Sequence, residues 1–63
     1  MSLQKQFRTV DYYEGFECLG YFNTYIEAYD CLKERIEDTD GECVVEVQTY
    51  SPLLDKYISY SED

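Results

Sequence analysis

Hydrophobic and polar residues alternate in the first part of the chain in the way expected of a β-hairpin. Residues 5–13 are rich in Phe, Thr, Val and Tyr, and their alternation predicts a half-buried strand. Glu14-Gly15 is a turn signal, and residues 16–22 predict the partner strand. Gly20 lies inside that second run, where an isolated glycine indicates a β-bulge.

A capping box predicts where the next element, a helix, begins. The Thr24 hydroxyl can accept a hydrogen bond from the amide of Glu27, whose carboxylate can reach back to the Thr24 amide. We expect the helix over residues 25–37 and its end at residues 38–41, where Gly41 can take a positive φ. Apolar residues recur at helical intervals on one face, which we expect to pack on the sheet: Tyr25, Ala28, Tyr29, Leu32 and Ile36.

The pattern after the helix predicts one more strand and a short final element. Residues 42–50 form the strand, because Cys43, Val45 and Val47 share one face. Ser51-Pro52 ends it and is also typical of a helix start, so the sequence favours a short helix within residues 52–60. The alternative is a loop followed by a strand over residues 57–60, since Tyr-Ile-Ser-Tyr has strand propensity.

This order of elements, strand-strand-helix-strand, predicts an α+β fold in the form of a small two-layer sandwich. An antiparallel sheet of three strands, or of four if the last segment is a strand, would pack against one main helix. A chain of 63 residues fits a single small domain, which we place over residues 1–63.

Charge narrows the classes of function more than any motif does. The chain has 14 acidic residues, 5 basic residues and no histidine, for a formal charge of −9. Histidine is the commonest acid–base catalyst and metal ligand, and nucleic-acid binding needs a basic surface. The acidic turn at residues 37–42 does not follow the calcium-loop pattern. We therefore expect no enzymatic activity, no cofactor, no metal ion and no direct contact with nucleic acid.

The cysteines and the hydropathy pattern indicate a compartment. Cys18, Cys31 and Cys43 cannot all pair within one chain, so we expect free, buried thiols in a reducing compartment. No basic segment followed by an apolar run marks a signal peptide, and no apolar stretch approaches the roughly 20 residues of a membrane span. The expectation is a cytoplasmic protein without membrane contact.

Carboxylates recur at steps of three and four along the expected helix and would line one stripe of it: Glu27, Asp30, Glu34 and Glu37. Successive groups would lie one helical turn apart, ~5–6 Å, close to the spacing of phosphates along a nucleic-acid strand. Such a stripe can dock on a basic surface of a larger protein, for example a nucleic-acid-binding protein. The alternative is a solvated face that only keeps the domain soluble.

Tyrosine is the second unusual feature of the composition. Eight tyrosines are more than so small a core can bury, so some of them must be exposed. Tyrosine is enriched where proteins recognise one another, and we predict Tyr12, Tyr13 and Tyr21 as anchors for a partner. The alternative is that these tyrosines pair across neighbouring strands.

In size, charge and element order, the chain resembles the small acidic proteins that bacteriophages and mobile elements encode to inhibit host polymerases, nucleases or defence complexes. The resemblance implies an inhibitor or modulator. The sequence as a whole predicts a non-enzymatic domain that binds a basic protein surface, with nucleic-acid mimicry as one form of that binding. The alternative is a structural domain that self-associates, for example as a homodimer, through a sheet edge or a tyrosine face.

Overall fold

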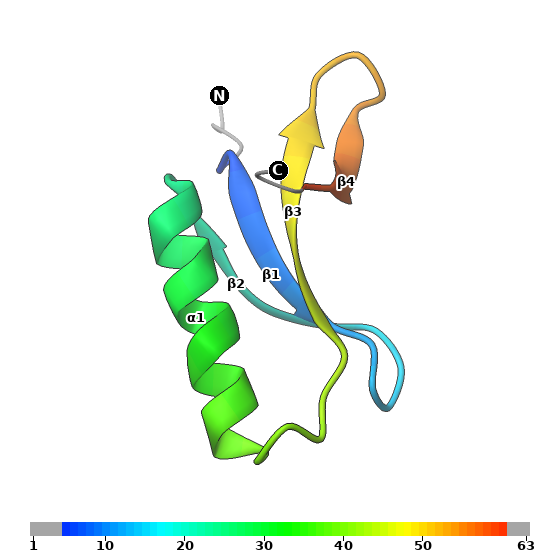
Figure 1. Cartoon of the computed structure of the whole chain (residues 1–63). Helices are drawn as coiled ribbons and strands as arrows, with labels where there is room; N and C mark the ends of the chain where they lie inside the picture. The colour runs from blue at the N-terminus through cyan, green and yellow to red at the C-terminus, as the bar shows by residue number, and fades with distance from the viewer. Residues whose placement is uncertain (1–4, 61–63) are drawn as a thin grey trace.

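The computed structural model describes residues 5–60, which form one four-stranded sheet and one helix. In chain order the elements are β1 (Phe7–Asp11), β2 (Glu17–Phe22), α1 (Tyr25–Asp38), β3 (Val45–Ser51) and β4 (Lys56–Ser59). The strands lie in the order β2-β1-β3-β4, and each neighbouring pair is antiparallel. The helix α1 lies along one side of this sheet (Figure 1). The predicted two-layer α+β fold is confirmed.

The β1–β2 hairpin contains the expected bulge. Thr9 lies opposite Gly20 and Val10 lies opposite Cys18, so Leu19 is the extra residue on β2. A Cβ atom on residue 20 would lie 2.8 Å from the Phe22 ring, which explains why glycine stands there.

Both ends of α1 are capped by local hydrogen bonds. The Thr24 hydroxyl accepts from the Glu27 amide at 3.3 Å and donates to the Glu27 carboxylate at 3.1 Å. The Glu27 carboxylate thus accepts a hydrogen bond from the Thr24 hydroxyl and not from the Thr24 amide, a small departure from the predicted capping box. At the other end the Gly41 amide donates to the Ile36 carbonyl at 2.9 Å with φ of +86°, as expected.

The small core lies where α1 crosses the centre of the sheet. Ala28 and Val47 are buried, and the buried Thr9 hydroxyl donates to the Ala28 carbonyl at 2.7 Å. Tyr29 and Ile36, which we predicted in the core, remain about two-fifths exposed. They lie farther round the helix from Ala28 than Leu32 does, so the narrow sheet does not cover them completely.

The favoured prediction of a helix within residues 52–60 is wrong, and the alternative of a loop and a strand is confirmed. β4 pairs with β3, and Tyr57 lies directly opposite Tyr50 with ring centres 5.5 Å apart. Leu53 at the hairpin turn is 97% exposed and Leu54 is also exposed, so these two side chains do not pack on the sheet. Cross-strand packing of the aromatic residues instead favours the strand.

Candidate functional site

The seven predicted site residues do not form one surface, because α1 and the open side of the sheet face opposite directions. The carboxylates Glu27, Asp30, Glu34 and Glu37 lie together on α1 and are all exposed. We call this group the acidic helix surface. Tyr12 and Tyr21 lie on the other side of the sheet, and Tyr13 lies at the turn between β1 and β2. The structure therefore separates the predicted electrostatic residues from the predicted anchors.

The four carboxylates of the acidic helix surface differ in their local partners. Glu27 accepts the cap hydrogen bond from Thr24, and Asp30 lies 3.8 Å from the Lys33 ammonium. Within residues 5–60, Glu34 and Glu37 form no ion pair and their side chains form no hydrogen bond. Their charges are therefore directed entirely to solvent, where they can act on an approaching partner.

The side of the sheet opposite α1 is not covered by another described element (Figure 1). Directly opposed residues in a sheet share a face, and Arg8 on β1 lies opposite both Tyr21 on β2 and Gln48 on β3. We call this side the open sheet face. Its polar and aromatic members are Arg8, Tyr12, Phe16, Tyr21, Glu46, Gln48, Tyr50 and Tyr57.

Arg8 is at the centre of the open sheet face, between aromatic rings. Its guanidinium carbon lies 4.5 Å from the centre of the Tyr57 ring and 5.1 Å from that of the Phe16 ring. Its Nε donates to Gln48 at 2.7 Å. Cation–π contacts on two sides and one hydrogen bond hold the guanidinium in place. Arg8 nevertheless forms no ion pair with any carboxylate of the described residues, in a chain with 14 acidic groups.

The carboxylate of Glu46 on the open sheet face already accepts hydrogen bonds from neighbouring donors. Glu46 accepts from the Gln48 side-chain amide at 2.6 Å and from the Ser59 hydroxyl at 3.1 Å. The Gln48 amide also donates to the Tyr12 hydroxyl at 2.9 Å. This network fixes the ring of Tyr12, which was predicted as an anchor and is 42% exposed.

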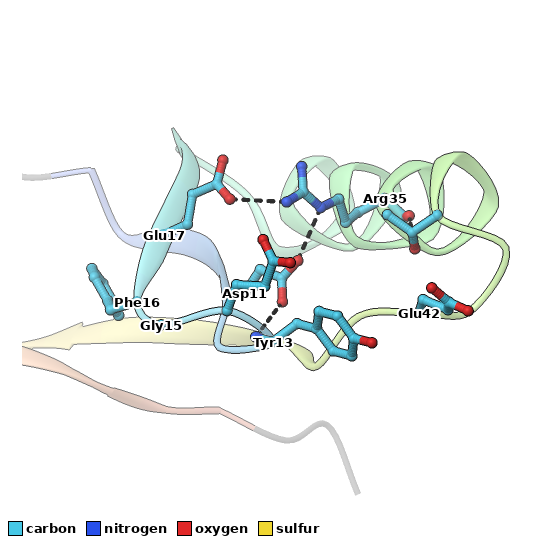
Figure 2. Close-up of a pocket in the computed structure, with 9 residues that line it drawn as sticks. Asp11, Tyr13, Gly15, Phe16, Glu17, Arg35 and Glu42 are labelled. Carbon is cyan, nitrogen blue, oxygen red and sulfur yellow. Dashed lines mark hydrogen bonds and ion pairs between the residues drawn. The ribbon is translucent and has the colours of Figure 1, made fainter.

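Tyr13 belongs to a third region, an acidic hollow between the β1–β2 turn and the end of α1 (Figure 2). The hollow has a volume of about 500 Å³. Its charged members are Asp11, Glu14, Glu17, Arg35 and Glu42, and its rings are Tyr13 and Phe16. Phe16 thus touches both the hollow and the open sheet face, through its contact with Arg8.

Asp11, which is buried, forms an ion pair with the partly exposed Arg35 at the inner wall of the hollow. The Arg35 Nε lies 2.9 Å from one Asp11 oxygen, and an Arg35 terminal nitrogen lies 2.9 Å from Glu17 (Figure 2). The other Asp11 oxygen accepts from the backbone amides of Tyr13 and Val44. The pKa of Asp11 is lowered, first by the Tyr13 amide and further by the Val44 amide and Arg35. The pKa of Arg35 is raised, chiefly by its hydrogen bond to Asp11.

Sequence reasoning missed Arg8, Phe16 and the Asp11–Arg35 pair. Arg35 lies on the helix and Asp11 on the first strand, and the spacing of residues along the chain does not show how close these two elements come. Asp11 shares a strand face with Thr9, but that this face packs against the helix is shown by the structure and not by the sequence. Nothing in the sequence indicated the contact between Phe16 and Arg8, because that contact depends on the shape of the β1–β2 turn.

The cysteines are free and half-buried, which is less than the complete burial we predicted. Burial raises the pKa of the Cys31 thiol, so less of it is thiolate at neutral pH. Within residues 5–60 no group of three or more Cys, Asp or Glu side chains is placed to hold a metal ion. The one helix of this region, α1, is too short and too polar to cross a membrane.

Comparison with protein-family models, with curated proteins and with solved structures found no match for this chain.

Proposed function

We propose that this chain is a non-enzymatic protein-binding domain whose acidic helix surface docks on a basic surface of a larger protein. In that role it would act as an inhibitor or modulator of the kind that phages and mobile elements encode. Its partner would be a protein whose basic surface serves nucleic acid, because carboxylates one helical turn apart present negative charge at a similar spacing to phosphates. The free, half-buried thiols support a reducing compartment such as the cytoplasm.

The observation that carries this proposal is the unneutralised charge of the acidic helix surface. Of its four exposed carboxylates, Asp30 alone lies within ion-pair distance of a described basic side chain, and that pair, with Lys33, is itself exposed. A solvent-exposed pair at 3.8 Å contributes little to stability and leaves the local field negative. Added to the charge of −9, this field would speed the encounter with a basic partner.

A second candidate function, self-association, is favoured by the open sheet face. Phe16 and Tyr21 are at least half exposed there, and large exposed rings are typical of interfaces. Two copies of a chain with charge −9 repel each other, however, so a dimer would have to overcome that repulsion. We therefore prefer a basic partner over a second copy.

Capture experiments with charge-matched variants test the proposal. The immobilised domain is incubated with a lysate of its native cells at low and at moderate salt, and the bound proteins are identified. The double variant Glu34→Gln/Glu37→Gln should lose the partner. The control Asp40→Asn/Asp55→Asn removes the same charge from exposed turn positions outside the acidic helix surface and should retain it. A partner held equally by wild type and both variants would contradict the proposal.

A further inference from the structure

The open sheet face has a chemistry that the acidic helix surface does not share. It combines exposed aromatic rings with a cation, Arg8, that forms no ion pair among residues 5–60, and it lies on the other side of the molecule. Tyr12 and Phe16 have ring centres 5.6 Å apart, and Tyr21 and Tyr57 have ring centres 5.7 Å apart. Arg8 lies between these two pairs, in contact with Phe16 and Tyr57. The rings and the guanidinium therefore form one continuous surface.

Hydrogen-bond donors on this surface are available to a ligand. Arg8 uses its Nε for Gln48, while its two terminal nitrogens donate to none of the residues 5–60. The Tyr21 hydroxyl likewise has no partner among these residues, and Tyr21 is 50% exposed. The Glu46 carboxylate on this face is already engaged, since it accepts hydrogen bonds from the side chains of Gln48 and Ser59. A ligand for this face should offer acceptors and apolar surface, and it needs no donors.

Net charge decides between the two ligand types that offer such acceptors. A carboxylate would suit Arg8, but a chain of charge −9 repels acidic partners. A proline-rich segment offers backbone carbonyls without negative charge. Its proline rings pack on aromatic side chains, its imino nitrogens carry no proton, and its extended conformation is largely preformed. The open sheet face offers exposed rings on which prolines can pack, and the Arg8 and Tyr21 donors can bind the backbone carbonyls.

The acidic hollow next to Phe16 indicates what should flank the prolines. Arg35 is committed to Asp11 and Glu17, whereas Glu14 and Glu42 form no ion pair among the described residues. Phe16 borders both the hollow and the open sheet face. A basic side chain beside the prolines would enter the hollow and meet these two carboxylates.

We propose that the open sheet face binds a proline-rich segment of a partner protein, with a basic residue next to the prolines placed in the acidic hollow. This inference rests on the proposed function, since it assigns a second contact to the same protein-binding domain. The acidic helix surface would supply long-range attraction, and the open sheet face would supply contact specificity.

The test measures the affinity of a synthetic proline-rich peptide that has arginines beside the prolines. Two matched peptides are the controls, one with alanine in place of each proline and one with glutamate in place of each arginine. We expect the first peptide to bind and both controls to bind at least about tenfold more weakly. Amide chemical shifts should change at Arg8, Phe16 and Tyr21 on binding. Equal affinity for the proline and alanine peptides would overturn the inference, because charge alone would then explain the binding.

Two exposed positions supply variants that should fold normally. Phe16→Ala and Tyr21→Ala should each weaken peptide binding by about tenfold, as loss of an aromatic anchor does. Ile26→Ala removes an exposed apolar side chain on α1 and should leave the affinity unchanged. If the peptide does not bind, or binds all three variants as it binds wild type, the inference is wrong. The proposed function would survive that result if partner capture still depended on Glu34 and Glu37.

Discussion

The guanidinium carbon of Arg8 on β1 lies 4.5 Å from the centre of the Tyr57 ring on β4. These strands are not neighbours, because β3 lies between them. The contact therefore crosses a strand and ties the C-terminal hairpin to the first strand. The Tyr57 hydroxyl strengthens this connection by donating to the Lys5 carbonyl at 2.7 Å.

The first prediction concerns the energy of this contact. Replacing Tyr57 by leucine keeps an apolar side chain but removes the cation–π interaction. A double-mutant cycle with Arg8→Gln, measured by chemical unfolding, should give a coupling free energy of about 1 kcal/mol. Lys33 and Tyr29 form a similar contact at 5.3 Å on the exposed side of α1 and serve as the control pair. Coupling no larger for Arg8–Tyr57 than for the control would show that the contact contributes nothing specific.

The contact also shows where sequence reasoning reached its limit. The strand alternation, the bulge at Gly20 and the cap at Thr24 depend on neighbouring residues, so the sequence predicted them. The final segment could not be assigned this way, because Ser51-Pro52 favours a helix start while Tyr-Ile-Ser-Tyr at residues 57–60 favours a strand. The ring of Tyr50 opposite Tyr57 decides in favour of the strand, and that pairing is visible only once β3 is placed.

The candidate site could be predicted only in part, again because spacing along the chain does not show how the elements pack together. Helical spacing was enough to place Glu27, Asp30, Glu34 and Glu37 on one surface. It could not show that Tyr12 and Tyr21 lie on the opposite side of the molecule. That depends on which face of the sheet the helix covers, and both faces of β1 contain buried residues, Thr9 on one and Val10 on the other.

The second prediction is acid sensitivity caused by Asp11. The folded-state pKa of this carboxyl lies below its unfolded value of about 3.9, so its stabilising effect is present above that pH. The effect is lost as the pH falls through the folded-state pKa, where Asp11 gains a proton and its bonds to Arg35 and the two amides weaken.

Thermal unfolding as a function of pH measures this effect. Asp11→Asn should be less stable than wild type at neutral pH, and its midpoint should fall less steeply below pH ~4. Glu14→Gln removes a carboxylate that forms no ion pair among residues 5–60 and should keep the wild-type slope. The assignment to Asp11 fails if Asp11→Asn has the wild-type slope as well.

The third prediction concerns the start of α1. Thr24→Ala removes the hydroxyl that accepts from the Glu27 amide, and the free energy of unfolding should fall by about 1 kcal/mol. Thr24→Ser keeps the hydroxyl and should lose much less. Equal losses for alanine and serine would show that the methyl group matters and that the cap does not.

The fourth prediction concerns the oligomeric state. Because each copy has a charge of −9, light scattering over a concentration series at low salt should give the mass of a monomer. Added salt should raise the midpoint of thermal unfolding by screening repulsion among carboxylates. A dimer that persists on dilution at low salt would favour the self-association candidate, and Phe16→Ala should then dissociate it.

The association rate of the captured partner tests the central claim most directly. We predict a rate constant for wild type that falls steeply as the salt concentration rises to about 0.15 M, where the Debye length is about 8 Å. For Glu34→Gln/Glu37→Gln, the rate at low salt should be lower and its dependence on salt weaker. A rate constant that responds neither to salt nor to these two substitutions would contradict docking through the acidic helix surface.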